Sequence, residues 1–319
     1  MRAAVVTGYG PPEVVDVVEV ADPAPGPGQV LVRVEAVAVS AGDARIRGAR
    51  FPRGFGLPGR LALGWSRPRR PVLGAALSGV VVATGEGVGD LAPGDAVCAM
   101  NGTRMGGHAE LAVLDGTRVV RLPDGVDHRT AAGLLFGGTT ALPYLRDKGR
   151  MRLGARVLVV GAGGEVGTSA LQVARLLGGD VTAVTHRDNA DLVGRLGATT
   201  VLDREATDVT ALHERFDVVL DTGGTLTPRT GRRLLTPEGR LLLVAADLPQ
   251  TLQAVGRVQA GPAPERTADV EALLGWAAAG SLRAVVDSEY ALDDVVAAHA
   301  RVDTGRKVGT VLLLPRASR

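Results

Sequence analysis

The residues with the clearest chemical meaning form a glycine-rich turn in the middle of this 319-residue chain. The turn follows a Val-rich run and precedes a segment with helical periodicity; it consists of Gly161, Ala162, Gly163, Gly164, Glu165, Val166 and Gly167. Small residues let the backbone approach a pyrophosphate, and a helix N-terminus offers free N–H groups. We therefore predict that Ala162–Gly167 binds a dinucleotide, the alternative being an ordinary turn between a strand and a helix.

The residues after the second strand of this pattern indicate which dinucleotide the turn binds. An NAD site needs a carboxylate there for the ribose 2′-hydroxyl. This strand instead ends in Thr185, His186 and Arg187, and Arg204 stands just past the third strand. Cations at these positions favour a 2′-phosphate and predict NADPH as the cofactor. The competing interpretation places Asp188 on the 2′-hydroxyl, although that residue is also a good cap for the next helix.

Two further residues have acid–base chemistry. Asp43 either orients a substrate or a water molecule, or anchors a loop by accepting hydrogen bonds from backbone N–H groups. His108 follows two glycines and has a side chain whose ordinary pKa suits proton transfer near neutral pH. These alternatives are open at the level of sequence.

Residues 45–70 form a basic segment without a single acidic residue. Its eight arginines are Arg45, Arg47, Arg50, Arg53, Arg60, Arg67, Arg69 and Arg70, and the aromatic residues Phe51, Phe55 and Trp65 are interleaved with them. Arginine with aromatic side chains is typical of single-stranded nucleic acid binding. The same composition also suits a loop that recruits an anionic or aromatic substrate, or a simple solvated loop.

Composition excludes several classes of protein. Hydrophobic residues make up 45% of the chain, and the net charge of +2 does not favour nucleic acid as a partner of the whole molecule. The single cysteine, Cys98, can form neither an internal disulfide nor a cysteine cluster for zinc. No apolar run approaches the ~20 residues of a membrane span, and the N-terminus does not resemble a signal peptide. We therefore expect a cytoplasmic protein without a membrane partner.

The elements that must position these residues fall into two patterns. Short Val-rich runs separated by Pro and Gly clusters predict β-structure over residues 1–120, and residues 127–146 have a helical pattern. From residue 156 strands and helices alternate, which predicts a parallel, doubly wound sheet. The predicted strands are 157–160, 181–184, 200–202, 217–221 and 240–245, and the helices between them are 168–177, 188–196 and 228–235. Helices 265–279 and 292–302 and strands 283–286 and 307–314 follow.

Nine motifs spread over nearly the whole chain resemble the medium-chain dehydrogenase/reductase superfamily, and within it the zinc-independent, quinone-oxidoreductase-like branch. Besides the glycine turn they are Val39–Asp43, Gly79–Gly85, Gly94–Val97, Gly107–Leu111, Gly138–Leu142, Leu196–Ala198, Asp217–Gly223 and Gly305–Gly309. The resemblance implies an α/β protein with a GroES-like β-rich catalytic domain at residues 1–124, completed by a C-terminal return at 264–319. A Rossmann domain at 125–263 would lie between them, with the active site in the cleft.

The resemblance also implies roles for individual residues. Ser40 and Thr140 are expected near the nicotinamide. The cofactor cleft is expected to be lined by Asp221, Thr222, Gly223, Val244, Ala245 and Lys307. Family members are commonly dimers or tetramers, and we expect a homodimer.

The chain departs from the zinc-using relatives in ways that define the expected reaction. Gly74-Ala75-Ala76 stands where those relatives carry Gly-His-Glu, and their four-cysteine lobe is missing. We therefore expect no metal and an NADPH-dependent reduction of a small molecule, a quinone or an α,β-unsaturated carbonyl. One alternative is an RNA-binding protein that retains NADPH. Another is an enoyl-thioester reductase or a tailoring reductase of a biosynthetic pathway.

Overall fold

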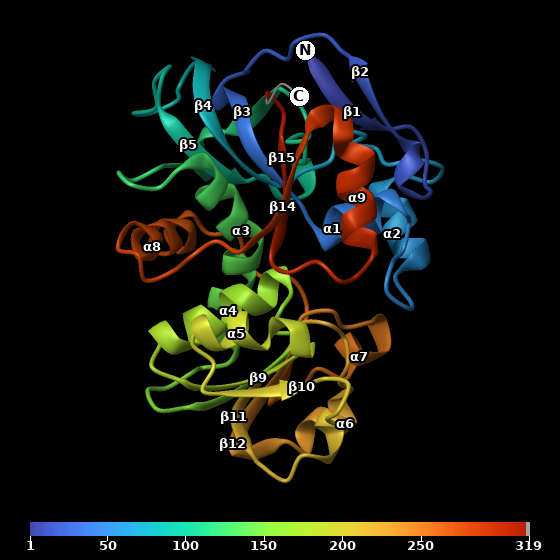
Figure 1. Cartoon of the computed structure of the whole chain (residues 1–319). Helices are drawn as coiled ribbons and strands as arrows, with labels where there is room; N and C mark the ends of the chain where they lie inside the picture. Colours follow the sequence, from blue (N-terminus) through green and yellow to red (C-terminus); the bar gives the residue numbers. More distant parts are fainter. Residues whose placement is uncertain (317–319) are drawn as a thin grey trace. The chain divides into compact units, whose positions relative to one another are not determined.

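The computed structural model describes residues 1–316, and contacts between residues divide the chain into two units (Figure 1). The first unit contains Met1–Phe51, Gly56–Phe136 and the chain from Glu265 onward. The second contains Pro52–Phe55 and Gly137–Pro264. The predicted domain limits lay at 124/125 and 263/264. The predicted C-terminal return runs to residue 319, so its last three residues, 317–319, lie outside the described residues.

The first unit is built on one long central strand, β3. Its strands are β1 (Arg2–Val6), β2 (Val15–Glu19), β3 (Gln29–Val39), β4 (Ala76–Thr84), β5 (Ala96–Met100), β6 (Leu111–Asp115), β7 (Val119–Arg121), β14 (Val286–Ala291) and β15 (Thr310–Leu314). One edge of β3 pairs with β4, and the other edge pairs with β6 near its start and with β15 near its end. Valine and alanine fill the buried positions of β3, and the valines suit a pleated, enclosed strand.

The helices of the first unit include one, α9 (Val295–Asp303), that packs into the core around β3. They are α1 (Ala41–Arg47), α2 (Gly56–Leu63), α8 (Thr267–Ala278) and α9, and α3 (His128–Pro143) runs from this unit into the second. Side chains of α9 belong to the apolar core that also contains the buried valines of β3. The C-terminal segment therefore completes the core of the N-terminal one.

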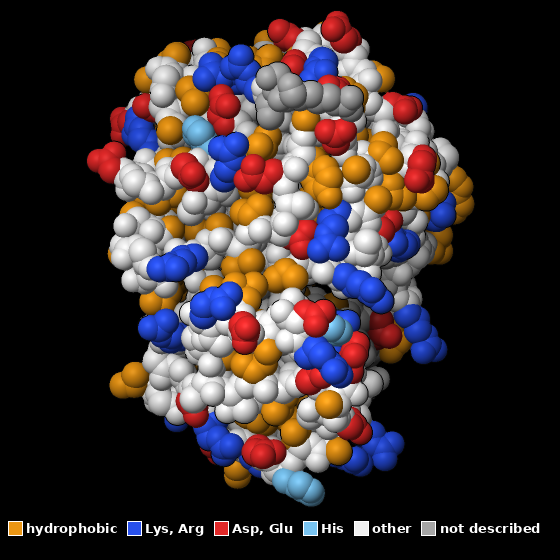
Figure 2. Space-filling model, viewed as in Figure 1, with side chains coloured by type: hydrophobic (Ala, Val, Ile, Leu, Met, Phe, Trp, Pro, Cys, Tyr) orange, Lys and Arg blue, Asp and Glu red, His pale blue; other side chains and the backbone are white. Residues whose placement is uncertain are grey.

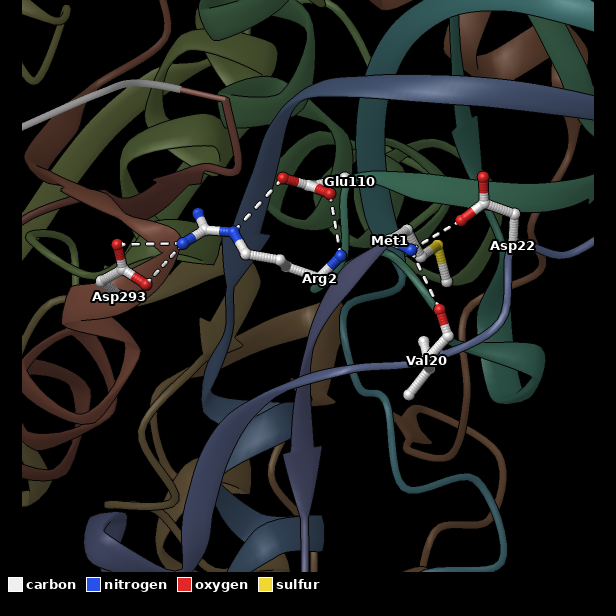
Figure 3. A network of polar contacts seen from close by, with 6 residues as sticks. All are labelled: Met1, Arg2, Val20, Asp22, Glu110 and Asp293. Atoms are coloured by element: carbon white, nitrogen blue, oxygen red, sulfur yellow. Dashed lines mark hydrogen bonds and ion pairs between the residues drawn. The ribbon is translucent and has the colours of Figure 1, made fainter.

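Polar contacts fix the start of β1 (Figure 3). The Met1 ammonium donates to Asp22 at 2.6 Å. The backbone N–H of Arg2 donates to Glu110 at 2.8 Å, and its guanidinium donates to Asp293 at 2.9 Å. These contacts join β1 to segments that lie far away in the sequence.

The second unit is a parallel sheet of six strands in the order β10-β9-β8-β11-β12-β13. The strands are β8 (Arg156–Val160), β9 (Asp180–Thr185), β10 (Thr200–Asp203), β11 (Phe216–Asp221), β12 (Leu235–Leu243) and β13 (Val258–Gln259). The helices are α4 (Glu165–Leu176), α5 (Ala190–Arg195), α6 (Pro228–Arg232) and α7 (Leu248–Leu252). Counted along the chain, this order is 3-2-1-4-5-6, so the predicted doubly wound sheet is confirmed.

The sequence signal was strong here because β8 and β11 are buried on both faces. Such strands have continuous apolar sequences rather than alternating ones. Leu158, Val160 and Val219 belong to one core cluster of this sheet.

Some expected elements differ from the structure. Residues 283–286 were predicted as a strand, but β14 begins only at Val286 and continues through the polar residues Asp287–Glu289. Its pairing with β15 outweighs their low strand propensity. The basic segment 45–70 is not one loop, because it contains α2 and the end of α1. The helix after the glycine turn begins at Glu165 rather than at residue 168.

Among the helices within residues 1–316, none is both long enough and apolar enough to cross a membrane.

Candidate dinucleotide-binding site

The glycine turn lies where the strand order of the parallel sheet reverses. β8 and β11 are neighbours in the sheet, with Val160 opposite Asp221. The chain leaves β8 toward one edge of the sheet and reaches β11 on the other side of β8. Ligands of doubly wound sheets bind outside the carboxyl ends of the strands at this point. The turn Gly161–Gly167 follows β8, and the segment Asp221–Gly224 follows β11.

Three glycines of the turn cannot be replaced without moving other atoms. Gly161 has a φ of +84°. A Cβ on Gly163 would lie 2.9 Å from the Thr185 hydroxyl. A Cβ on Gly167 would lie 2.2 Å from the carbonyl oxygen of Gly161. The glycines therefore allow the turn to fold tightly on itself between β8 and α4.

The same turn presents backbone donors. Within residues 1–316, the N–H groups of Gly163, Val166 and Gly167 have no hydrogen-bond acceptor. The N-cap residue of α4 is Gly164, which has no side chain that could accept a hydrogen bond from these N–H groups. Free N–H groups at a helix N-terminus, together with the helix dipole, are what a phosphate anion requires.

Glu165 occupies the first turn of α4, and its side chain is only 6% exposed. A carboxylate in the first turn of a helix interacts favourably with the helix dipole. α3 packs closely against this turn, since a Cβ on Gly137 would lie 2.3 Å from the Glu165 carbonyl oxygen. The Glu165 side chain is therefore held in the packed interior rather than extended into solvent.

Asp221 shapes the segment after β11. Its fully buried carboxylate accepts hydrogen bonds from the N–H groups of Gly223 and Gly224 at 3.0 Å and of Leu226 at 2.6 Å. Burial raises the pKa of Asp221, and these backbone hydrogen bonds oppose the rise. Asp221 thus holds the loop in shape and leaves Gly223 exposed beside the glycine turn.

Three more contacts bring the predicted cofactor residues of this unit together. The Thr222 hydroxyl donates to the carbonyl oxygen of Val160 at 2.9 Å. The N–H of Val244 donates to the Asp221 carbonyl at 2.9 Å, and the Cβ of Ala245 lies 3.7 Å from the position that a Cβ on Gly224 would occupy. The ends of β8, β11 and β12 therefore form one continuous edge.

The predicted cationic residues at the ends of β9 and β10 have acidic neighbours. Arg187 forms an ion pair with Asp203 at 3.1 Å, and its guanidinium lies 4.0 Å from Glu205. His186 lies 3.3 Å from Glu205 and 3.2 Å from Asp188. Asp203 and Glu205 were not predicted as neighbours of these cations, because the predicted strand ended at residue 202 and the next residues were unassigned.

Thr185 and Arg204 are linked through the backbone. The N–H of Arg204 donates to the carbonyl oxygen of buried Thr185 at 2.7 Å. The exposed Arg204 guanidinium has no hydrogen-bond or ion-pair partner within residues 1–316. It is the cation of this edge that is not already neutralised by a carboxylate.

Ser40 and Asp43 lie in the first unit, where they form a capping box at the start of α1. The Ser40 hydroxyl donates to the Asp43 carboxylate at 2.6 Å, and the N–H of Gly74 donates to its other oxygen at 2.9 Å. Asp43 is 2% exposed. These contacts are those of a loop anchor.

The remaining predicted residues are divided between the units. Thr140 lies on α3 in the second unit. Lys307 lies in the first unit, where its Nζ donates to the Gly309 carbonyl at 2.6 Å.

A buried histidine pair lies near Asp43. His108 Nε2 is 3.1 Å from the Ala38 carbonyl oxygen, and its ring centroid lies 5.6 Å from that of His299. His299 on α9 is 0% exposed, and neither of its ring nitrogens has a hydrogen-bond partner among the described residues, 1–316. Burial, together with repulsion from His108, lowers the pKa of His299 to about 3. No motif marks His299 in the sequence, since its neighbours on α9 are ordinary core residues.

Two family models match the chain. The alcohol dehydrogenase GroES-like domain matches residues 26–124, and the zinc-binding dehydrogenase family matches residues 196–313. The chain belongs to the medium-chain dehydrogenase/reductase superfamily, in its quinone-oxidoreductase-like branch. The first unit contains its GroES-like fold and the second its Rossmann fold.

Relatives within the superfamily include proteins of different kinds. The mouse (Mus musculus) synaptic vesicle membrane protein VAT-1 homolog is 32% identical over 76% of this chain, which spans 58% of that protein. A quinone oxidoreductase of Pseudomonas aeruginosa is 29% identical over 96% of this chain and 97% of its own length. A mycobacterial protein solved in complex with NADPH is 27% identical, with a TM-score of 0.82 over 99% of this chain and 100% of that one.

The residues of this superfamily member fit a nicotinamide dinucleotide at the Rossmann sheet. Gly163 and Gly167 allow the turn to pack tightly, and three N–H groups of the turn have no acceptor within residues 1–316. At the ends of β9 and β10 the fit is less complete, because Arg187 is already paired with Asp203. Arg204 supplies an additional positive charge there.

Zinc-binding members of the superfamily hold their metal through Cys, His and acidic side chains. Within residues 1–316, no group of three or more His, Cys, Asp or Glu side chains is arranged to hold a metal ion. Cys98 is buried in β5, and burial raises the pKa of its thiol to about 12. The thiol therefore stays protonated at neutral pH and is a poor metal ligand.

Proposed function

We propose that this chain is an NADPH-dependent oxidoreductase that reduces quinones or α,β-unsaturated carbonyls without zinc. The observation that carries the proposal is the glycine turn, with its free N–H groups at the reversal point of a 3-2-1-4-5-6 parallel sheet. The NADPH complex of the mycobacterial relative and the activity named for the Pseudomonas relative support it.

When bound, NADPH would supply a hydride to the acceptor. The N–H groups of Gly163, Val166 and Gly167 would hold its pyrophosphate, and Arg204 and Arg187 its 2′-phosphate. Asp221 keeps the neighbouring loop in place through three backbone hydrogen bonds. These residues bind and orient the cofactor, which is the main contribution that a protein makes to hydride transfer.

We propose that Thr140 and Ser40 act beside the nicotinamide, as the family resemblance implies. The Ser40 hydroxyl donates its proton to Asp43. Toward the nicotinamide, Ser40 would therefore accept a hydrogen bond rather than donate one. Asp43 is then a positioning residue that fixes Ser40. Lys307, in the segment before β15, would contact the cofactor. The proton that completes reduction would come from solvent.

A conjugated acceptor suits a protein without a Lewis acid. Hydride adds to an electron-poor carbon, and the negative charge moves to a distant oxygen that hydrogen bonds or water can stabilise. An isolated carbonyl lacks this outlet and needs stronger polarisation, commonly by a metal. Simple alcohol oxidation is therefore disfavoured for this chain.

The proposal is tested by NADPH consumption with 9,10-phenanthrenequinone and with 2-hexenal, beside NADP⁺ reduction with a plain alcohol. Crotonyl-coenzyme A tests the enoyl-thioester alternative. We expect turnover with a quinone or an enal, and at least tenfold tighter binding of NADPH than of NADH, about 1.4 kcal/mol. Turnover of the alcohol alone, without activity on either conjugated acceptor, would overturn the proposal.

We also propose a homodimer in the cytoplasm. Sedimentation velocity of the purified chain at micromolar concentration tests the first point, and a single species with the mass of one chain would contradict it.

A further inference from the structure

A hollow in the first unit is lined by residues that neither the cofactor site nor the proposed reaction uses. It lies between the end of β1 and the segment that follows α2, and its volume is about 630 Å³. Its lining comprises Val5, Val6, Thr7, Gly64, Trp65, Arg67, Pro68, Arg69 and Pro71. Small-molecule sites commonly have volumes of about 300–1,000 Å³. The hollow is therefore large enough for a compact organic ligand.

Hydrogen bonds hold both walls of the hollow in place. The N–H of Val6 donates to the Pro71 carbonyl at 2.9 Å, which joins β1 to the segment. The Tyr9 hydroxyl donates to the Gly64 carbonyl at 2.7 Å, and the N–H of Arg69 donates to the Leu63 carbonyl at 2.6 Å. A hollow with fixed walls loses less entropy on binding a ligand than a mobile loop would.

Gly64 shows that the turn after α2 is closely packed. Its φ is +126°, and a Cβ on it would lie 2.0 Å from the Arg67 carbonyl oxygen. Arg60 reinforces the turn from the side of α2. Its guanidinium donates to the Trp65 carbonyl at 2.7 Å and lies 5.3 Å from the centroid of the Tyr9 ring.

The lining of the hollow includes an exposed aromatic residue and two exposed arginines. Trp65 is 63% exposed, which is unusual for so large an apolar side chain. Arg67 and Arg69 are exposed, and neither guanidinium has a hydrogen-bond or ion-pair partner within residues 1–316. Elsewhere on the molecule, acidic and basic side chains are interspersed over much of the face shown in Figure 2.

The charge around the hollow has one sign. None of the lining residues is acidic, and no Asp or Glu occurs between Ala44 and Gly85. The Tyr9 hydroxyl donates to Gly64 in the wall of the hollow; burial raises the pKa of Tyr9, and the positive charges of Arg60 and Arg69 oppose the rise. An anion entering the hollow would meet positive charge without a competing carboxylate.

We propose that this hollow binds a planar aromatic carboxylate. The Trp65 ring offers a face for stacking, and Arg67 and Arg69 offer the planar donors that pair with a carboxylate. The valines and prolines of the lining cover the apolar part of the ligand. An extended nucleic acid is less suited, because the free arginine charges and the exposed ring converge on one hollow instead of following a groove.

The test uses naphthalene-2-carboxylate as the probe, with the full chain, in titration calorimetry. Naphthalene-2-carboxamide is the neutral ligand of the same shape, and cyclohexanecarboxylate is an anion without an aromatic ring. We expect saturable binding of the naphthoate below about 1 mM, and at least tenfold weaker binding of the other two. Equal binding of the amide and the carboxylate would overturn the proposal, as would no saturation.

Variants then test whether the naphthoate binds in the hollow. We expect R67Q/R69Q to weaken naphthoate binding at least tenfold, whereas R232Q/R233Q, a matched pair of exposed arginines in the second unit, leaves it within twofold. In a W276F background Trp65 is the only tryptophan, and its emission should change on binding. Unchanged affinity in R67Q/R69Q overturns the proposal. Tight binding of oligouridylate with none of naphthoate assigns the arginines to nucleic acid instead and also overturns it.

The inference is independent of the proposed reduction, because no residue of the hollow belongs to the cofactor site. NADPH affinity is measured on the same samples. Loss of NADPH binding with retained naphthoate binding would contradict only the proposed function, and the reverse result would contradict only the assignment of the hollow.

Discussion

Arg187 forms an ion pair with Asp203, whose carboxylate lies 3.1 Å from its guanidinium. On the proposed NADPH site, Asp203 both competes for Arg187 and repels the 2′-phosphate. We expect D203N to tighten NADPH binding about threefold and to leave NADH binding nearly unchanged, in line with the small free energies of exposed ion pairs. Asparagine keeps the oxygen that accepts from the Glu205 N–H, so the turn should persist. The measurement is the dissociation constant of each cofactor by fluorescence titration.

The control for this prediction is a double-mutant cycle with R187A. R187A alone should weaken NADPH binding, and D203N should have a smaller effect in that background. Weaker NADPH binding in D203N would mean that Asp203 orients Arg187 for the phosphate rather than competing with it.

Buried His299 makes the stability of the first unit depend on pH. In the folded protein the pKa of His299 is lowered to about 3 by burial and by His108, with Asp43 opposing and Arg47 adding to the shift. The unfolded chain takes up a proton below about pH 6.5 and the folded chain does not, so stability is lost as the pH falls from about 6.5 toward 3. Between pH 7 and pH 5 the loss should be about 2 kcal/mol.

The prediction is tested by urea unfolding followed by tryptophan fluorescence, since both tryptophans, Trp65 and Trp276, lie in the first unit. H299L should lose about 2 kcal/mol less stability than the unchanged protein between these pH values. H213Q, at an exposed histidine, should behave like the unchanged protein. The same pH dependence in H299L would refute the assignment.

At the scale of elements, the turn between β8 and α4 allows a cofactor cradle to be distinguished from an ordinary turn. A Cβ on Gly164 would lie 3.5 Å from its nearest neighbour, and Gly164 has a φ of −76° that alanine adopts freely. We therefore expect G164A to leave the free energy of unfolding unchanged, but to weaken NADPH binding at least tenfold by blocking the approach of the pyrophosphate. The measurements are urea unfolding and cofactor titration.

Two further glycines serve as controls for G164A. G167A should destabilise the protein itself, because its Cβ would meet the Gly161 carbonyl oxygen at 2.2 Å. G194A, on α5, has open space around its Cβ and should leave NADPH binding unchanged while raising stability by up to about 1 kcal/mol. Unchanged NADPH affinity in G164A would favour the ordinary turn.

The elements also show where sequence reasoning succeeds. The strands of the Rossmann sheet could be predicted because short, continuous apolar runs such as β8 are typical of strands buried on both faces of a parallel sheet. β14 could not, because Asp287, Ser288 and Glu289 have low strand propensity and only pairing with β15 makes them a strand. The glycine turn could be located from spacing alone. The pairing of Arg187 with Asp203 could not, since it depends on the alignment of β9 with β10.

For the whole molecule, we predict that no metal is needed. The zinc-binding dehydrogenase family matches residues 196–313, yet Gly74-Ala75-Ala76 replaces the Gly-His-Glu of zinc-using relatives. Elemental analysis of the purified protein should find less than about 0.1 zinc per chain, since a tetrahedral site needs three or four ligands of the right type. Activity should survive incubation with a chelator. One zinc per chain that is lost together with activity would contradict this.

The pairing of β15 with β3 has a consequence for how the chain is made. A ribosome adding about 5–20 residues per second completes β3 roughly 15–50 s before β15 appears, while residues 137–264 of the second unit emerge in between. The nascent chain thus carries an unpaired strand edge throughout that interval, which is the kind of surface that promotes aggregation. The second unit can therefore fold before β15 is available to pair with β3.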